Sequence, residues 1–194
     1  MITASGYCQE PGRKEAQDSK ERKRRFSILD SIHRIARHSG PWNSENKQMM
    51  MPTIVLKTLK LDLFGFWGVA TDRDYAALAF NLTDRLWKTI KLHNIPNIGR
   101  NIWVYESDHR VFAGVESENP AAASSVLESN IITLQKYAYY KHVGPYSLIK
   151  RAGEQMRAEL ATTNFETTLP YVEIYGHWTS DESLLETELL MALK

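Results

Sequence analysis

The sequence predicts an α+β domain in which one strand–helix–strand–strand unit occurs twice and builds an antiparallel sheet. Seventeen of the twenty aromatic residues follow residue 50, so the large side chains that form a core lie in residues 51–194. Within that segment equivalent features recur about 70 to 74 positions apart, such as Trp67-Gly68 and Lys141-His142, or Val104-Tyr105 and Ile174-Tyr175. A unit of this kind used twice predicts two related halves with a central ligand cleft between them.

Residues 1–50 are predicted to be a polar, basic extension of this domain. They contain ten Lys or Arg and six Asp or Glu, a net charge of +4, whereas residues 51–194 contain fourteen and seventeen, a net of −3. Apolar side chains at helical spacing predict one short amphipathic helix over residues 26–38. Basic runs can bind nucleic acid or a membrane surface, but they are more often solvated, and we favour a solvated extension.

The first unit begins with residues 53–70, whose β-branched and aromatic side chains predict one strand or a bent pair. A cluster of hydroxyl and acidic side chains at 71–74 then predicts the start of a helix that ends near Asn94 and Pro96. Its apolar face is predicted to contain Tyr75, Leu78, Ala79, Leu82, Leu86 and Ile90. Residues 101–107 and 110–117 predict two short strands joined by a turn at Asp108-His109, followed by a linker over 119–130.

The second unit repeats this order. Residues 130–143 predict one long strand, Gly144 a turn, and Pro145 the first position of a helix that ends by Asn164. The apolar face of that helix is predicted to contain Ile149, Ala152, Met156 and Leu160. Residues 170–178 and 183–193 predict the closing strand pair.

Several classes of protein are excluded or disfavoured by composition. A single cysteine, Cys8, excludes a disulfide framework and cysteine-rich zinc sites, and the six histidines lack metal-binding spacing. No apolar run is long enough to span a bilayer, and the first seventeen residues lack the apolar segment of a signal peptide. We therefore expect a cytoplasmic protein without a membrane partner, metal or cofactor. The acidic domain predicts no specific DNA binding. A homo-oligomer is compatible with these features.

Glu173 is the most informative single residue. Side chains alternate between faces in a strand, so Tyr171, Glu173, Tyr175 and His177 share one face, and Val172 and Ile174 lie on the other. We expect the apolar pair to pack beneath the helices. The carboxylate is flanked by aromatic rings, and no Lys or Arg occurs in residues 158–193. It is interpreted either as a buried ligand-binding group or as a glutamate on a solvated strand face.

The other candidate ligand-binding residues are aromatic. Trp67 and Trp103 lie on predicted strands of the first unit, where they would form a wall of the cleft opposite Glu173 or simply belong to the core. Tyr139 shares a face of its strand with Tyr137, and only one face of that strand can reach a ligand. His142 is interpreted as a structural hydrogen-bonding residue rather than a base.

Three motifs mark the second unit: H-x-G-P-Y at His142, Gly144, Pro145 and Tyr146, E-x-Y at Glu173 and Tyr175, and E-T-E at Glu186, Thr187 and Glu188. With them, residues 52–193 resemble the GyrI-like effector-binding domain, which is the drug-binding half of many AraC-type and MerR-type regulators and also occurs alone. In the first unit Gly68-Val69-Ala70-Thr71 replaces the His-Gly-Pro-Tyr turn. The resemblance implies two SHS2-like repeats and capture of cationic amphipathic molecules by a buried glutamate in an aromatic cage.

The favoured function is therefore that of a stand-alone binding protein that senses or sequesters cationic, aromatic compounds, with no catalytic residue. A DNA-binding regulator is disfavoured because fifty polar residues cannot hold the DNA-binding domains of AraC-type or MerR-type proteins. The resemblance also includes hydrolases of electrophilic natural products, in which Glu173 would activate water beside Tyr171 and Tyr175. It further includes gyrase-protecting members, which would require a protein partner.

Overall fold

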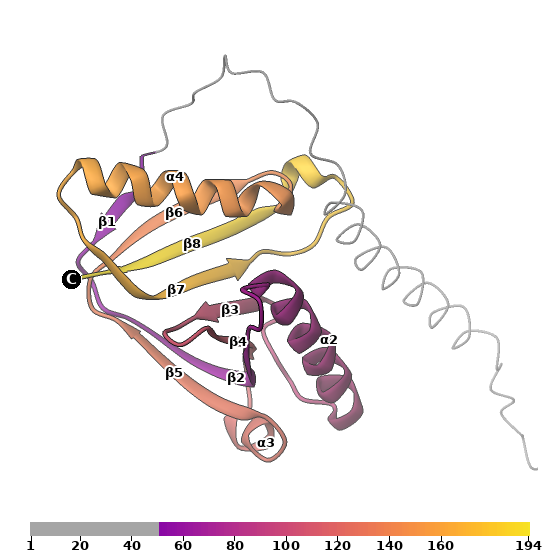
Figure 1. Cartoon of the computed structure of the whole chain (residues 1–194). Helices are drawn as coiled ribbons and strands as arrows, with labels where there is room; N and C mark the ends of the chain where they lie inside the picture. Colours follow the sequence, from indigo (N-terminus) through magenta and orange to yellow (C-terminus); the bar gives the residue numbers. More distant parts are fainter. Residues whose placement is uncertain (1–50) are drawn as a thin grey trace, which may run out of the picture. The chain divides into compact units, whose positions relative to one another are not determined.

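The computed structural model describes residues 51–194, and Figure 1 shows the arrangement of their helices and strands. The predicted basic extension and its helix at 26–38 lie outside the described residues. The strands are β1 (Thr53–Val55), β2 (Leu59–Val69), β3 (Asn101–Tyr105), β4 (Arg110–Glu116), β5 (Glu128–Leu134), β6 (Tyr137–Val143), β7 (Thr167–Tyr175) and β8 (Glu186–Leu193). The helices are α2 (Tyr75–His93), α3 (Pro120–Ser124) and α4 (Ile149–Thr162), with short 3₁₀ turns η1 (Tyr146–Leu148) and η2 (Glu182–Leu184).

The eight strands form one antiparallel sheet in the order β1-β6-β8-β7-β3-β4-β2-β5. One half contains β7, β8 and α4, and the other contains β3, β4 and α2, with β7 and β3 paired at the junction between them (Figure 1). The α+β class and the repeated strand–helix–strand–strand order predicted from the sequence are confirmed. Because β7 and β3 are paired in the middle of the sheet, side chains of both halves meet there.

Two long segments cross from one half of the sheet to the other. The first bends after Val55, so that β1 pairs with β6 while β2 pairs with β4 and β5. The second segment is also bent: residues 130–143, predicted to be one strand, divide into β5 and β6 on either side of Gln135-Lys136. The predicted linker at 119–130 is likewise wrong in part, because it contains α3 and the first residues of β5.

Local sequence signals account for the ends of the helices. The Asp74 side chain accepts a hydrogen bond of 3.1 Å from the backbone N–H of Ala77 and so caps α2. Asn94 ends α2 in the left-handed conformation at φ 51°. In the second half Gly144 has φ 134°, which permits the turn before η1 and α4. The buried positions of both helices match their predicted apolar faces.

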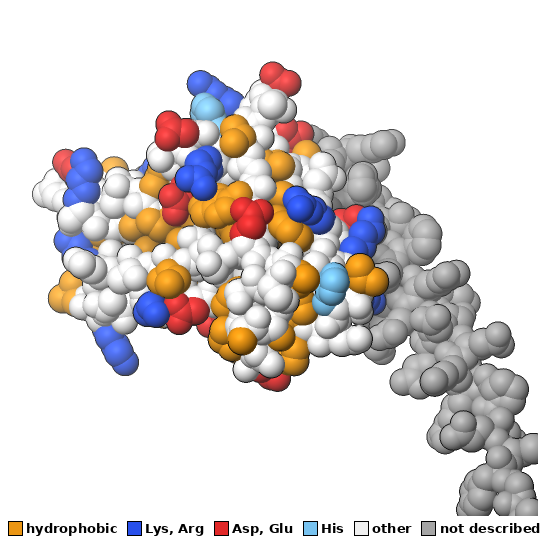
Figure 2. All heavy atoms as spheres, turned by 90° about the horizontal axis from the view of Figure 1, so that it is seen from below, with side chains coloured by type: hydrophobic (Ala, Val, Ile, Leu, Met, Phe, Trp, Pro, Cys, Tyr) orange, Lys and Arg blue, Asp and Glu red, His pale blue; other side chains and the backbone are white. Residues whose placement is uncertain are grey.

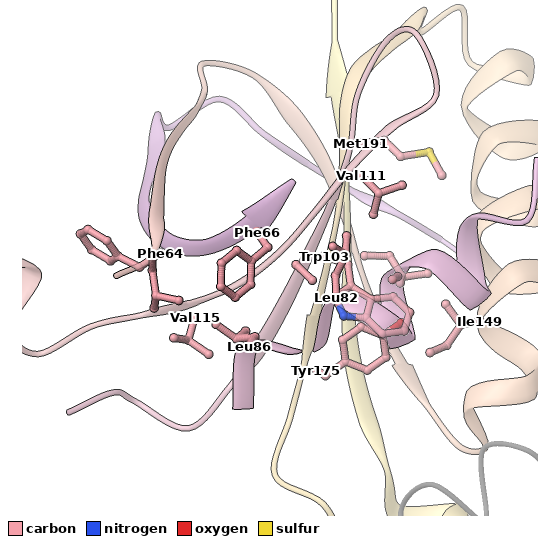
Figure 3. Packing of buried hydrophobic residues seen from close by; sticks show 14 of the residues in the cluster. Phe64, Phe66, Leu82, Leu86, Trp103, Val111, Val115, Ile149, Tyr175 and Met191 are labelled. Atoms are coloured by element: carbon pink, nitrogen blue, oxygen red, sulfur yellow. The ribbon is translucent and has the colours of Figure 1, made fainter. Parts of the chain in front are cut away.

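The two faces of the sheet contain different cores. Side chains of α2 and α4 pack on one face, against residues such as Trp103, Tyr175 and Met191 (Figure 3). The other face contains a second apolar cluster that includes Ile102, Val172 and Ile174 and no helical residue. The expectation that Val172 and Ile174 pack beneath the helices is therefore wrong, because β7 turns its Glu173 face toward them.

The surface of the domain mixes charges of both signs. Figure 2 shows one face, on which blue and red side chains are interspersed around hydrophobic ones. Within residues 51–194 no helix is both long enough and apolar enough to span a membrane.

Candidate functional site

Glu173 lies near the C-terminal end of β7, at the junction of the two halves. Its pairing partner on β3 is Trp103, and the neighbouring pairs are Tyr105 with Tyr171 and Asn101 with Tyr175. Trp103 and Glu173 are 70 positions apart in the sequence, the same spacing that relates the repeated Val104-Tyr105 and Ile174-Tyr175. The two repeats therefore meet at equivalent positions, and one of these positions holds an indole ring while the other holds a carboxylate.

The Glu173 carboxylate accepts hydrogen bonds from phenolic hydroxyls of both halves. Tyr105 Oη donates to Glu173 Oε2 over 3.0 Å and Tyr175 Oη donates to the same oxygen over 2.7 Å. The Tyr171 hydroxyl forms a third side-chain hydrogen bond to the carboxylate. Because Tyr105 and Tyr175 are equivalent residues of the two repeats, each repeat contributes the same kind of hydroxyl to the carboxylate.

Burial dominates the electrostatics of this group. The Glu173 side chain is 6% exposed, and this burial raises the pKa of its carboxyl, while the three tyrosine hydrogen bonds act in the opposite direction. Burial and the nearby carboxylate raise the pKa values of Tyr105, Tyr171 and Tyr175, so these hydroxyls stay protonated donors. None of the ion pairs within residues 51–194 includes Glu173.

Aromatic rings surround the carboxylate. Trp103 lies 4.6 Å from Tyr175 between ring centroids, and Tyr105 stacks on Tyr171 at 5.5 Å with an interplanar angle of 24°. Figure 3 shows Trp103 and Tyr175 next to each other, with Leu82 of α2 and Ile149 of α4 close by. The site thus combines one carboxylate with surrounding aromatic rings.

The outer rings of this shell are also related by the repeat. Tyr75 at the start of α2 contacts Tyr105 edge-on at 6.3 Å, and Tyr146 before α4 contacts Tyr175 edge-on at 5.3 Å. Tyr75 is further held by a hydrogen bond between its hydroxyl and Nδ1 of His109. Phe80 packs edge-on against Trp103 at 4.9 Å. Each half therefore places a tyrosine against the site at the start of its helical segment, Tyr75 as the first residue of α2 and Tyr146 in η1 just before α4.

Four of the six residues predicted to bind a ligand lie together: Glu173, Tyr171, Tyr175 and Trp103. Trp67 and Tyr139 do not join them, because both pack against the cluster on the opposite face of the sheet, where Trp67 contacts Phe112 at 5.0 Å. Trp67 was predicted to form a wall of the cleft with Trp103, and Tyr139 was a separate ligand-binding candidate. Both predictions followed strand membership, which could not determine which face of the sheet each side chain occupies.

Sequence reasoning missed Tyr105, Tyr75 and Tyr146 as members of this site. The signal for Tyr105 was present, since it is the repeat equivalent of Tyr175. Near the site, His142 Nε2 lies 3.2 Å from the carbonyl oxygen of Pro145, in agreement with its structural interpretation. Among residues 51–194 no group of three or more His, Cys, Asp or Glu side chains is arranged to hold a metal ion.

Comparison with solved structures identifies the architecture. SAV2435 bound to tetraphenylphosphonium matches with a TM-score of 0.54 and 17% identity over 75% of this chain and 94% of that chain. The EcmrR C-terminal domain matches with a TM-score of 0.56 and 14% identity over 75% and 99%. The chain has the GyrI-like effector-binding fold. A putative transcription regulation protein from Staphylococcus aureus MU50 shares it, with a TM-score of 0.51 and 17% identity over 75% and 99%.

No protein-family model matches this sequence, and no curated protein matches it either. At identities of 14–17%, these similarities establish the GyrI-like fold alone. The function of this GyrI-like domain depends on the chemistry around Glu173.

Proposed function

We propose that residues 51–194 bind cationic aromatic or amphipathic small molecules, with Glu173 as the group that recognises the positive charge. The observation that carries this proposal is a buried carboxylate whose hydrogen-bond partners are three neutral hydroxyls. Neutral donors satisfy its lone pairs but leave its charge unbalanced, and an unbalanced buried charge is costly. A ligand cation supplies the missing charge.

The walls of the site suit the rest of such a ligand. Trp103, Tyr105, Tyr171 and Tyr175 present ring faces and edges around the carboxylate. A cation over an aromatic ring gains about 0.5–2 kcal/mol, with the larger values in desolvated sites. The ligand bound to SAV2435, tetraphenylphosphonium, combines a permanent positive charge with four phenyl rings and so has this chemistry. We infer a role in sensing or sequestering such compounds.

Calorimetric titration with tetraphenylphosphonium tests the proposal. Glu173→Gln preserves the shape of the side chain and removes its charge, so the affinity should fall about thirtyfold, which corresponds to roughly 2 kcal/mol. Binding of neutral triphenylphosphine oxide should change little. The matched control is Glu188→Gln. Glu188 is half-buried and shares a face of β8 with Leu190, and that face is turned away from Glu173. Equal phosphonium affinities for wild type and Glu173→Gln would refute the proposal.

Hydrolysis is the second candidate, and one observation favours it. The pKa of Glu173 is raised by burial, and a carboxyl with a raised pKa beside aligned hydroxyls has the properties of a general acid or base. Steady consumption of an electrophilic substrate by wild type, abolished in Glu173→Gln, would establish this activity. Saturable binding of the phosphonium without turnover of candidate substrates would favour the binding protein.

A further inference from the structure

A row of polar side chains extends from the site across the second half of the sheet. Thr187 on β8 pairs with Tyr175 on β7 and with His142 on β6. Thr187, Leu189 and Met191 occupy every second position of β8 and so share one face, and Leu189 and Met191 belong to the helix-covered core. The side chain of Thr187 is therefore on the same face as Glu173 and Tyr175. The hydroxyl of Thr187 is thus a direct cross-strand neighbour of a residue that binds the Glu173 carboxylate.

This hydroxyl lacks a partner. Thr187 is 0% exposed, and its Oγ1 is one of three buried side-chain polar atoms of the described residues without a hydrogen bond. His142 Nε2, on the paired strand β6, lies 3.2 Å from the carbonyl oxygen of Pro145, and because a carbonyl only accepts, the proton on this nitrogen is used in that hydrogen bond. Leaving a buried hydroxyl unpaired is unfavourable, because its bonds to water are lost and not replaced.

The first half of the protein shows that the fold does not need this hydroxyl. Val111 on β4 pairs with Tyr105 on β3 and with Gly68 on β2, as Thr187 pairs with Tyr175 and His142. Val111 is the structural counterpart of Thr187, and it is also 0% exposed within the helix-covered core. Valine and threonine have nearly the same shape. The second half therefore has a hydroxyl where the first half fills the same position with a methyl group.

We propose that Thr187 Oγ1 forms a hydrogen-bonding subsite for a neutral hydroxyl group carried by the cationic ligand. This inference rests on the proposed function of Glu173 and refines it: the ligand class becomes aromatic cations with a hydroxyl substituent. A threonine hydroxyl both donates and accepts, so it can complete the hydrogen bonds of an alcohol. Tyr175 lies between the two subsites and would contact both the cation and the substituent.

The experiment compares two cations that differ in one group. The first is tetraphenylphosphonium with a hydroxymethyl group on one ring, at the meta or the para position, and the second has an ethyl group at the same position. Wild type should bind one of the hydroxymethyl isomers about fivefold more tightly than its ethyl counterpart, the gain expected from one net hydrogen bond. Thr187→Val should bind both with equal affinity and retain its affinity for the ethyl compound.

Two further variants and one stability measurement separate this role from a structural one. Thr187→Ser keeps the hydroxyl and should keep the preference. Val111→Thr places a hydroxyl at the equivalent position of the first half and should leave the preference unchanged. In the absence of ligand, Thr187→Val should raise Tm by about 2–5 °C, because it removes an unpaired buried polar group. A variant that is more stable and yet less selective has lost a ligand contact and not a fold contact.

The outcomes distinguish this inference from the proposed function. Equal binding of the hydroxymethyl and ethyl compounds by wild type, or a preference that survives in Thr187→Val, overturns the subsite while leaving Glu173 as the charge-recognising group. Failure of wild type to bind any of these phosphonium ions overturns both.

Discussion

The two halves of the domain share an architecture and differ in chemistry. At the junction the first half contributes Trp103 and the second contributes Glu173, at equivalent positions of paired strands. One strand further out, the first half has Val111 and the second has Thr187. At these two positions the first half has apolar side chains and the second has polar ones, although Tyr105 of the first half also donates to the Glu173 carboxylate. The difference teaches that a duplicated fold can place a charge in its centre because the opposing copy provides the apolar, aromatic surroundings.

The largest expected effect of a substitution on stability is at Trp103, which pairs with Glu173 at the junction. Trp103→Ala should destabilise the domain by about 3–5 kcal/mol, because it removes a buried indole that contacts Phe80 and Tyr175 and donates to Thr83 Oγ1 over 2.9 Å. Urea unfolding measures this loss. Glu173→Gln should instead leave stability unchanged or increase it. Trp178→Ala, at a partly exposed ring, is the control. Equal losses from Trp103→Ala and Trp178→Ala would contradict the assignment.

The two equivalent tyrosines provide the next comparison. Tyr175→Phe should cost about 1.5–3 kcal/mol of stability at a pH where Glu173 is ionised, because a hydrogen bond to a charged group is lost. Tyr105→Phe should cost less, since its bond is 3.0 Å long rather than 2.7 Å. Each change should also raise the pKa of Glu173 further. Denaturant titration of both variants measures which substitution costs more stability. Tyr140→Phe, on the same face of the sheet, is the reference variant. The reverse order would show that hydrogen-bond length does not determine their contributions.

The pH dependence of stability sharpens the contrast between the charged and the uncharged centre. Because burial raises the pKa of Glu173, the folded state binds this proton more tightly than the unfolded chain does. The contribution to stability is therefore fully present at low pH, decreases as the pH rises above the unfolded value near 4.5, and is lost above the folded pKa. As the pH rises through this range, the Tm of Glu173→Gln should increase relative to that of wild type. The affinity of wild type for tetraphenylphosphonium should also increase with pH, because the carboxylate becomes charged. A Tm difference independent of pH would indicate an unshifted carboxyl.

The smallest effect concerns the helix above the site. Gly153 lies inside α4, and a Cβ at this position would be 3.2 Å from Tyr171 Oη. Gly153→Ala should change stability by less than about 1 kcal/mol, because improved helix propensity offsets the close contact. Affinity for the phosphonium should fall severalfold, since the Tyr171 hydroxyl has to shift. Glu154→Ala, at an exposed position of the same helix, should change neither quantity. An unchanged affinity would show that Tyr171 tolerates the displacement.

Much of the fold was predictable because its signals are local. The apolar spacing of residues 75–90, the Asp74 cap and the left-handed Asn94 each depend on a few neighbouring residues. The Asp108-His109 turn is equally local, with both residues at positive φ of 56° and 59°. The alternation along β7 placed Tyr171, Glu173 and Tyr175 on one face, and the structure confirms their grouping.

The remaining features depend on contacts between distant segments. Which face of β7 lies under the helices, and therefore whether Glu173 or Val172 is covered by them, depends on how both helices dock on the sheet. The split at Gln135-Lys136 follows from pairing with β2 on one side and with β1 and β8 on the other. Trp67 has the composition of a site residue, but the register of β2 places it on the far face.

The sequence by itself determined the two repeats, the helices and the row of alternating side chains that carries Glu173, because periodicity and capping act over a few residues. The tertiary structure alone decided that the two repeats meet at Trp103 and Glu173, and that Tyr105 joins the carboxylate from 68 positions away. Strand pairing across the junction creates this site, since no local pattern specifies which residue of one repeat faces which residue of the other.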